Sequence, residues 1–141
     1  MPKSMQLEVI TPSKLFYKGD VELVIARTLS GDEGFMAGHT WAVKLLDAGE
    51  LWFQEEGSKD FRIAALAGGF IDVKEDIIIF TDAAEWPEDI DLERAQHEKE
   101  FAENWLKNPS DDDAEIAKAK IAIAKSLTRM HVKAGGFRRK R

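Results

Sequence analysis

The stretch from Glu85 to Glu100, EWPEDIDLERAQHEKE, carries side chains whose types and spacing could do chemistry. Asp91 and Arg94 stand three residues apart, which makes a carboxylate and a guanidinium neighbours on a helix surface. An exposed ion pair of this kind adds only about 0.2–0.5 kcal/mol, so stability alone is a weak reason for it. Three roles therefore remain open for this stretch: a helix cap, a ligand site, and a hinge between two modules.

The segment from Ser30 to His39, SGDEGFMAGH, is the second candidate, because glycines and a histidine can build an anion or metal site. We expect Gly31, Gly34 and Gly38 to lie in a loop between strands, where glycine supplies turn and bulge geometry. No helix is expected to follow this loop and offer its N-terminal amides to a phosphate. His39 has no cysteine and no nearby histidine with which to share a metal, so no metal site is predicted.

Catalytic residues are hard to assemble from the remaining sequence. The order of serines, histidines and aspartates includes no nucleophile-elbow turn, and the carboxylates are scattered over strand faces that we expect to be exposed. The chain contains no cysteine, which excludes disulfides and thiolate chemistry and fits a reducing environment. Catalysis is therefore hard to build from these residues, and none of them calls for a required cofactor.

The first part of the chain alternates with period two, which is typical of strands with one buried face. The alternating apolar sets are Met5, Leu7 and Val9; Val21, Leu23 and Ile25; and Phe61, Ile63, Ala65 and Ala67. The run DIIIFTD at 76–82 predicts a strand covered on both sides, and AGGF at 67–70 predicts a bulge or close backbone packing. Frequent turn signals separate about eight to ten short strands, so a β sandwich or small barrel is predicted at residues 1–86.

From Pro87 onward the apolar period becomes that of a helix. An apolar stripe on a charged surface predicts an amphipathic helix of about five turns. The stripe consists of Leu92, Ala95, Ala102, Trp105 and Leu106. Pro109 should stop this helix, and Ser110 with Asp113 forms a capping-box pattern for the next one.

The second predicted helix has two faces. Its apolar stripe, with intervals of three and four, consists of Ile116, Ala119, Ile123, Leu127 and Met130. At about 100° per residue, Lys118, Lys125 and Arg129 fall together on nearly the opposite side and form a basic face. Gly135 and Gly136 should end the helix. The hairpin, placed at residues 87–141, cannot bury its apolar surface alone and must lean on the β domain or on a partner.

The charge of the chain is distributed unevenly. The net charge is −6, yet residues 1–87 carry 8 basic and 15 acidic side chains whereas residues 88–141 carry 12 and 11. A basic C-terminal arm, FRRKR at 137–141, could meet nucleic acid, anionic lipid or an acidic protein. Nucleic acid is not a predicted partner, because it normally needs a basic face on the folded domain as well. No apolar run approaches the roughly 20 residues of a membrane span, so we expect neither insertion nor export.

Several segments taken in order resemble a known family. LEVITPSKLFYKGDVELV, GDEGFMAGH, AGGFIDV and IDLERA follow one another as in the epsilon subunit of bacterial F-type ATP synthases, called delta in mitochondria. The resemblance covers nearly the whole chain. The family loop is close to G-E-L-G-I-L-P-G-H, and Gly31, Gly34, Gly38 and His39 stand in place. Residues 35–37 depart from its I-L-P part, and Trp41 stands where proline is common.

The resemblance implies a non-catalytic rotor subunit of the central stalk, with a β sandwich that binds the gamma subunit and the c ring and a helical hairpin that switches between folded and extended positions. In the extended position the second helix would enter the alpha-beta head, where its basic face would meet acidic beta loops, and block ATP hydrolysis. The subunit would lie at the cytoplasmic face of the bacterial cell membrane, attached peripherally through the complex. The implied contacts to the c ring and gamma are Ser30, Gly31, Asp32, Glu33, Phe35 and His39.

IDLERA also matches the I/L-D-x-x-R-A pattern by which some bacterial members bind ATP as a regulatory ligand that holds the hairpin folded. The implied ATP contacts are Ile90, Asp91, Arg94 and Ala95, with Glu85 nearby, and Lys118, Lys125 and Arg129 toward the phosphates. The ATP-binding members carry arginine at all three of the latter positions. Lysine lacks the bidentate fork of arginine, so the resemblance implies weakened phosphate binding.

Two other classes of protein remain open from the sequence. One is a free-standing adaptor whose β domain and hairpin dock different proteins. Such an adaptor would not co-purify with a gamma subunit at equal stoichiometry. The other is a small hydrolase built around His39, which requires a nucleophile beside that histidine in the folded chain.

Overall fold

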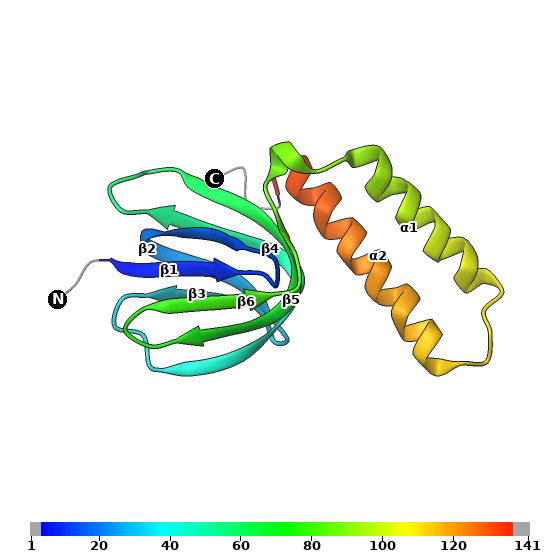
Figure 1. Ribbon diagram of the computed structural model, residues 1–141, viewed down its shortest axis with the longest axis horizontal. Helices are drawn as coiled ribbons and strands as arrows, with labels where there is room; N and C mark the ends of the chain where they lie inside the picture. Colours follow the sequence, from blue (N-terminus) through cyan, green and yellow to red (C-terminus); the bar gives the residue numbers. More distant parts are fainter. Residues whose placement is uncertain (1–3, 137–141) are drawn as a thin grey trace.

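A closed β barrel and a hairpin of two helices form the two parts of the computed structural model, which describes residues 4–136 (Figure 1). The elements of the barrel are β1 (Met5–Ile10), β2 (Leu15–Thr28), β3 (Gly31–Met36), β4 (Ala42–Glu55), β5 (Phe61–Val73), β6 (Ile77–Thr81) and β7 (Ala84–Glu85). A 3-10 turn, η1 (Pro87–Asp89), leads to α1 (Leu92–Lys107) and α2 (Asp113–Lys133). The predicted fold class is confirmed, and the predicted basic arm at 137–141 lies outside the described residues.

The sheet closes on itself through β1. This strand pairs antiparallel with β2 and parallel with β6, and the path β6, β5, β4, β2 completes the ring. Within residues 4–136 the sheet has seven strands, fewer than the eight to ten predicted. The reason is that β2, β4 and β5 are 14, 14 and 13 residues long, so each serves more than one side of the barrel.

The predicted alternation holds in β1 and fails in β2. Met5, Leu7 and Val9 are all buried in the barrel core. In β2, by contrast, Val21 is buried but Leu23 and Ile25 are only half-buried. The pairing of β2 with β4 shifts register between residues 21 and 23, and such a bulge turns the following side chains to the opposite face. The core positions beyond the bulge are therefore 24, 26 and 28.

The alternating set predicted in β5 lies on the outer face of the barrel. Ala64 and Leu66 point into the core, whereas Ile63 and Ala65 belong to a second apolar cluster with Ile90. Val132 of α2 completes that second cluster. An outer face with apolar side chains is explained by the hairpin that covers it.

Of the two predictions for AGGF, close backbone packing is confirmed and a bulge is not. Gly68 and Gly69 have φ of +96° and +127°, a region that residues with a Cβ rarely adopt. The register of β5 against β4 does not shift here, because Leu46 lies opposite Gly69 and Ala48 lies opposite Ala67. A Cβ on Gly69 would also collide with the backbone of Phe80.

The glycine-rich segment at 30–39 is mostly strand, which corrects the predicted loop. β3 occupies Gly31–Met36 and pairs with β2 through a tight turn at residues 29–30. Thr28 closes this turn, since its hydroxyl donates to the Gly31 carbonyl at 2.9 Å and accepts from the Ser30 amide at 3.1 Å. A second turn follows, in which Gly38 has φ of +87°.

The helices begin and end at identifiable caps. Asp91 caps α1, because its carboxylate accepts from the Arg94 amide at 3.1 Å. Asp112 caps α2, and the Ser110 capping box was predicted wrongly: the Ser110 hydroxyl donates to the Glu115 side chain at 3.0 Å instead. The predicted end of the second helix is confirmed, since residues 135 and 136 both have positive φ.

The hairpin rests on the barrel through α2. This helix contacts β4, β5 and η1, whereas α1 packs mainly against α2 and the link between the helices lies at the end away from the barrel (Figure 1). On α2 the buried apolar side chain is Val132, and Leu127 of the predicted stripe is 37% exposed. Neither described helix is long and apolar enough to cross a membrane.

Candidate functional site

A cleft of about 530 Å³ lies where the two helices meet the barrel edge. Its floor consists of small residues of β5, and its walls carry charged side chains from β7, α1 and α2. The charged lining residues are Asp82, Glu85, Arg94, Glu98, Lys125 and Arg129. Three cations therefore face three carboxylates in one opening. Such a cleft can bind a charged ligand, and its own cations and carboxylates can also pair with one another.

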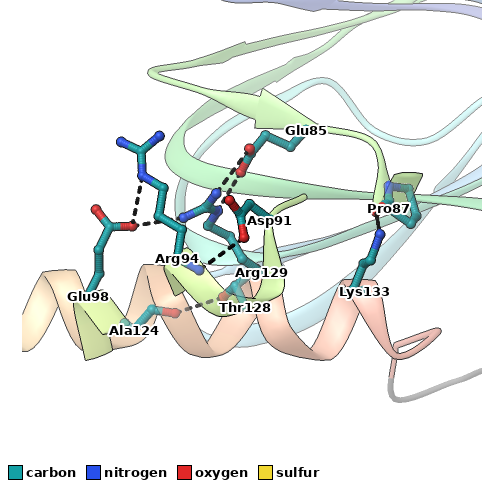
Figure 2. Close-up of polar contacts among 9 residues, drawn as sticks. All are labelled: Glu85, Pro87, Asp91, Arg94, Glu98, Ala124, Thr128, Arg129 and Lys133. Carbon is teal, nitrogen blue, oxygen red and sulfur yellow. Dashed lines mark hydrogen bonds and ion pairs between the residues drawn. The ribbon is translucent and has the colours of Figure 1, made fainter. Parts of the chain in front are cut away.

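Arg129 is the centre of the charged group (Figure 2). Its Nε and Nη2 donate to the two carboxylate oxygens of Glu85 at 2.6 and 3.3 Å, and its Nη1 donates to Glu98 Oε1 at 3.0 Å. Glu98 also lies 3.8 Å from Nε of Arg94. We call these four residues the Arg129 cluster; it joins β7, α1 and α2.

The guanidinium of Arg129 is held in a partly desolvated position. Its side chain is 18% exposed, compared with 33% for Glu85 and 49% for Glu98. A bidentate pair of this geometry is stronger than an isolated surface contact, because the planar fork is pre-organised and water is partly excluded. The Arg129 cluster thus connects α2 to β7 and to α1.

The residues carried over as ATP contacts divide into three groups. Glu85, Arg94, Lys125 and Arg129 line the cleft together. Ile90 and Ala95 are buried, with 4% and 0% exposure, and Asp91 is occupied as the cap of α1. Lys118 is exposed and does not line the cleft. Packing and capping therefore account for Ile90, Asp91 and Ala95, whereas Glu85, Arg94 and Glu98 line the cleft.

Sequence reasoning missed Glu98 and Asp82 as cleft residues. The spacing of Arg94 and Glu98 at i and i+4 was a usable signal, because it places the two on one face of a helix. For Asp82 there was no local signal, since its place in the cleft depends on how the helices pack over the strand end. Among residues 4–136, no group of histidine, aspartate and glutamate side chains is arranged to hold a metal ion.

The residues carried over as contacts of the β domain lie at and after the β2–β3 turn. Phe35 is fully buried in the core, so it supports the barrel and its side chain cannot form part of a contact surface. Ser30, Gly31, Asp32, Glu33 and His39 are exposed or half-exposed.

Two carboxylates beside this turn are held by neighbouring residues. Lys44 Nζ and the Thr28 hydroxyl donate to Glu33 at 2.6 and 2.7 Å, and these hydrogen bonds lower the pKa of Glu33 below its usual value. Arg27 Nε donates to Asp32 at 2.5 Å. These three donors, Lys44, Thr28 and Arg27, hold the two carboxylates of the turn in place.

The hydrogen bond and the ring contact of His39 do not join it to a nucleophile. Its Nδ1 lies 2.6 Å from the Thr40 carbonyl oxygen, and its ring meets the edge of the Phe35 ring with centroids 4.9 Å apart. Neither group is a nucleophile.

The junction, residues 86–91, is anchored on its barrel side by an aromatic group. Trp86 stacks on Phe16 with centroids 4.4 Å apart, and the Arg62 guanidinium lies 4.2 Å from the Trp86 ring centroid. Burial and the nearby Glu55 carboxylate raise the pKa of Tyr17, which belongs to the same group, above its usual range. Any movement of the hairpin must therefore begin after Trp86.

The comparisons with known proteins match both parts of the chain. Residues 4–87 match the model of the ATP synthase delta/epsilon chain β-sandwich domain, and residues 88–134 match the model of its long α-helix domain. The ATP synthase epsilon chain of Caldanaerobacter subterraneus is 38% identical over 134 residues, which cover 94% of this chain and 95% of that protein. The epsilon chain of Alkaliphilus metalliredigens is 42% identical over 107 residues, covering 75% and 78%.

Solved structures agree with these matches. A chain in the Euglena gracilis mitochondrial ATP synthase (OSCP/F1/c-ring) superposes with a TM-score of 0.79 at 26% identity, covering 91% of this chain and 80% of that one. A chain in the central stalk and c ring of the Tetrahymena thermophila mitochondrial ATP synthase gives a TM-score of 0.67 at 18% identity, covering 94% and 97%, and shows likeness of fold alone.

Proposed function

Because the chain belongs to the family of ATP synthase delta and epsilon chains and is a non-catalytic stalk subunit, we propose that its hairpin regulates ATP hydrolysis. The barrel binds the gamma subunit and the c ring and turns with them. The hairpin leaves the barrel, enters the alpha-beta head and blocks rotation in the direction of hydrolysis. The subunit lies at the cytoplasmic face of a bacterial cell membrane, held there through the complex.

One observation carries this proposal: the hairpin contacts the barrel through a small surface that includes no part of the barrel core. The apolar contact includes Ala65, Ile90 and Val132 with Ile63, and α2 also lies against β4. The polar contacts are the Arg129 cluster and the hydrogen bond from Lys133 to the Pro87 carbonyl. The barrel core is closed without any residue of α1 or α2. Separation of the hairpin therefore costs a few side-chain contacts and leaves the barrel folded.

Charge favours the extended position once the hairpin has separated. Lys125 and Arg129, now turned toward the cleft, would join Lys118 on one exposed side of α2. A basic helix face is attracted to acidic loops of the head over about a Debye length, which speeds the encounter and fixes its orientation.

ATP is the regulatory ligand that we assign to the cleft. Arg94, Lys125 and Arg129 would face its phosphates, and a ligand that touches both β7 and the two helices would hold the hairpin folded. Three carboxylates share the opening, and lysine replaces an arginine fork at residue 125, so binding should be weak. We expect a dissociation constant in the millimolar range or weaker, which corresponds to about −4 kcal/mol.

Deletion of residues 88–141 tests the inhibitory role. The complex that carries the truncated chain should still assemble and couple proton flow, because the barrel is intact, while its ATP hydrolysis rises above that of the complete complex. Co-purification of the truncated chain with gamma at equal stoichiometry is the control for loss of the subunit. Unchanged hydrolysis in an assembled complex would remove the inhibitory role.

Titration of the isolated chain with ATP tests the regulatory ligand. Calorimetry should give millimolar or weaker binding, and Arg129→Ala should abolish it. Lys99→Ala is the matched control, because Lys99 pairs with Glu103 along α1 and does not line the cleft. Micromolar binding would contradict the expected weakness, and binding that survives Arg129→Ala would move the ligand away from the cleft.

A further inference from the structure

The chain supplies its own anions to Arg129. Two oxygens of Glu85 meet Nε and Nη2 of the guanidinium, and Glu98 meets Nη1 from the other helix (Figure 2). An arginine that binds phosphate uses the same donors in the same fork. The carboxylates therefore occupy the positions at which phosphate oxygens would have to sit.

The same contacts are the polar attachment between the hairpin and the barrel. Glu85 belongs to β7, Glu98 to α1 and Arg129 to α2, so one guanidinium links all three elements. Lys133 adds a further link, since its Nζ donates to the Pro87 carbonyl at 3.1 Å. A nucleotide that held the hairpin folded would bridge the same elements that Glu85 and Glu98 already bridge.

We propose that Glu85 and Glu98 act as a built-in anionic ligand of Arg129, which holds the hairpin on the barrel without nucleotide and competes with phosphate for the guanidinium. The inference rests on the proposed function only in taking phosphate as the competing anion. It makes the two carboxylates the determinants of nucleotide affinity in this chain. Weak binding then results from competition within the cleft as well as from the lysine at residue 125.

Glu98 is the carboxylate to remove first. It is the more exposed of the two and contacts the guanidinium with a single oxygen, so its loss leaves the bidentate pair with Glu85 in place. Glu98→Gln weakens the contact with Nη1, because a neutral amide oxygen replaces a charged one, and it removes a negative charge that repels phosphate. Affinity for a polyphosphate should therefore rise, whereas a purely structural role of Glu98 predicts unchanged or weaker binding.

The binding test uses the full chain and two probes, ATP and inorganic tripolyphosphate. By calorimetry, Glu98→Gln should lower the dissociation constant for both by about two- to fivefold, the effect expected for one partly exposed charge pair. Glu103→Gln, which removes a carboxylate from α1 outside the cleft, should leave both constants unchanged.

Three results of this titration would overturn the proposal. They are an unchanged or larger dissociation constant in Glu98→Gln, a gain with ATP but none with tripolyphosphate, and undetectable binding by both chains. Undetectable binding by both the parent chain and Glu98→Gln overturns the proposal, because weakening the Glu98 contact would then have revealed no phosphate site.

A distance measurement tests the attachment. The chain has no cysteine, so spin labels can be placed at exposed positions by Lys59→Cys and Lys118→Cys. Without nucleotide, the labelled chain should show one narrow distance distribution, and Glu85→Gln should broaden it or add a second population. A broad distribution in the parent chain, or an unchanged distribution in Glu85→Gln, would overturn the proposal. Both tests use the isolated chain, so they stand apart from the hydrolysis assay that tests the inhibitory role.

Discussion

The barrel and the hairpin of this chain are stabilised by different means. The barrel closes its sheet through β1 and surrounds a core of large, fully buried side chains such as Leu51, Phe53 and Ile71. The hairpin buries few residues, and on α1 these are Ala95 and Ala102. One part is held by its own core, and the other is held by a neighbour. This difference is what allows one part to move while the other stays assembled.

The boundary between the two kinds of stability lies within the junction. Trp86 belongs to the barrel by its contacts with Phe16 and Arg62. Four residues later, Ile90 belongs to the small cluster under α2. The short 3-10 turn between them has no buried residue. A hinge at this turn would change its backbone angles and leave the barrel core closed.

The largest expected effect breaks the barrel. Phe53→Ala removes a fully buried ring from the core and should lower the free energy of unfolding by about 3–5 kcal/mol, measured by urea denaturation. Phe101→Ala is the matched control on the hairpin, because Phe101 is 74% exposed, and its effect should be within about 0.5 kcal/mol. Equal effects of the two changes would contradict the division of the chain into a cored and a docked part.

A smaller effect separates the hairpin without unfolding the barrel. Val132→Ala removes the fully buried apolar contact of α2 and should weaken docking by about 1–2 kcal/mol. Hydrogen exchange should speed up in α1 and α2 and stay unchanged in β1 and β6. Leu127→Ala, at a position 37% exposed on the same helix, is the control. Faster exchange throughout the barrel would show that the two parts unfold together.

The sequence predicted the fold well where local patterns decide it. The alternation in β1, the close backbone packing at Gly68 and Gly69, and the stop after α2 all follow from short-range chemistry. It failed in β2, where the register shift against β4 reverses the faces. Such a shift is set by the partner strand and by closure of the barrel, so no window of β2 alone contains it.

Part of the candidate site could not be predicted from the sequence, because it depends on contacts between elements. Arg94 and Arg129 were named from the sequence, but their common carboxylate, Glu98, was not. The pairing of Glu98 with Arg129 depends on the packing of α1 against α2, which the sequence of a single helix does not specify. Lys118 was included because it shares a face with Lys125, yet it lies about 10 Å further along the helix axis. A shared helix face predicts the direction in which side chains point, but not how far each lies from the cleft.

The smallest expected effect is on the pH dependence of barrel stability. Hydrogen bonds from Lys44 and Thr28 lower the pKa of Glu33 in the folded barrel. The ionised carboxylate is thus favoured by folding, so this contribution is present above the pKa of the unfolded chain and is lost as pH falls through the lower folded value. Urea denaturation between pH 6 and pH 3 should show a smaller loss of barrel stability in Glu33→Gln than in the parent chain.

Glu56→Gln provides the matched control for this pH effect, because it removes an exposed carboxylate of the barrel away from the β2–β3 turn. Its pH dependence should follow that of the parent chain. The contribution of Glu33 acts on strands that remain paired whether or not the hairpin is docked, so the same difference between Glu33→Gln and its parent should appear in a chain that ends at residue 87. A difference that vanishes in the shortened chain would show that the β2–β3 turn and the hairpin are coupled, and the two parts would then not be energetically separate.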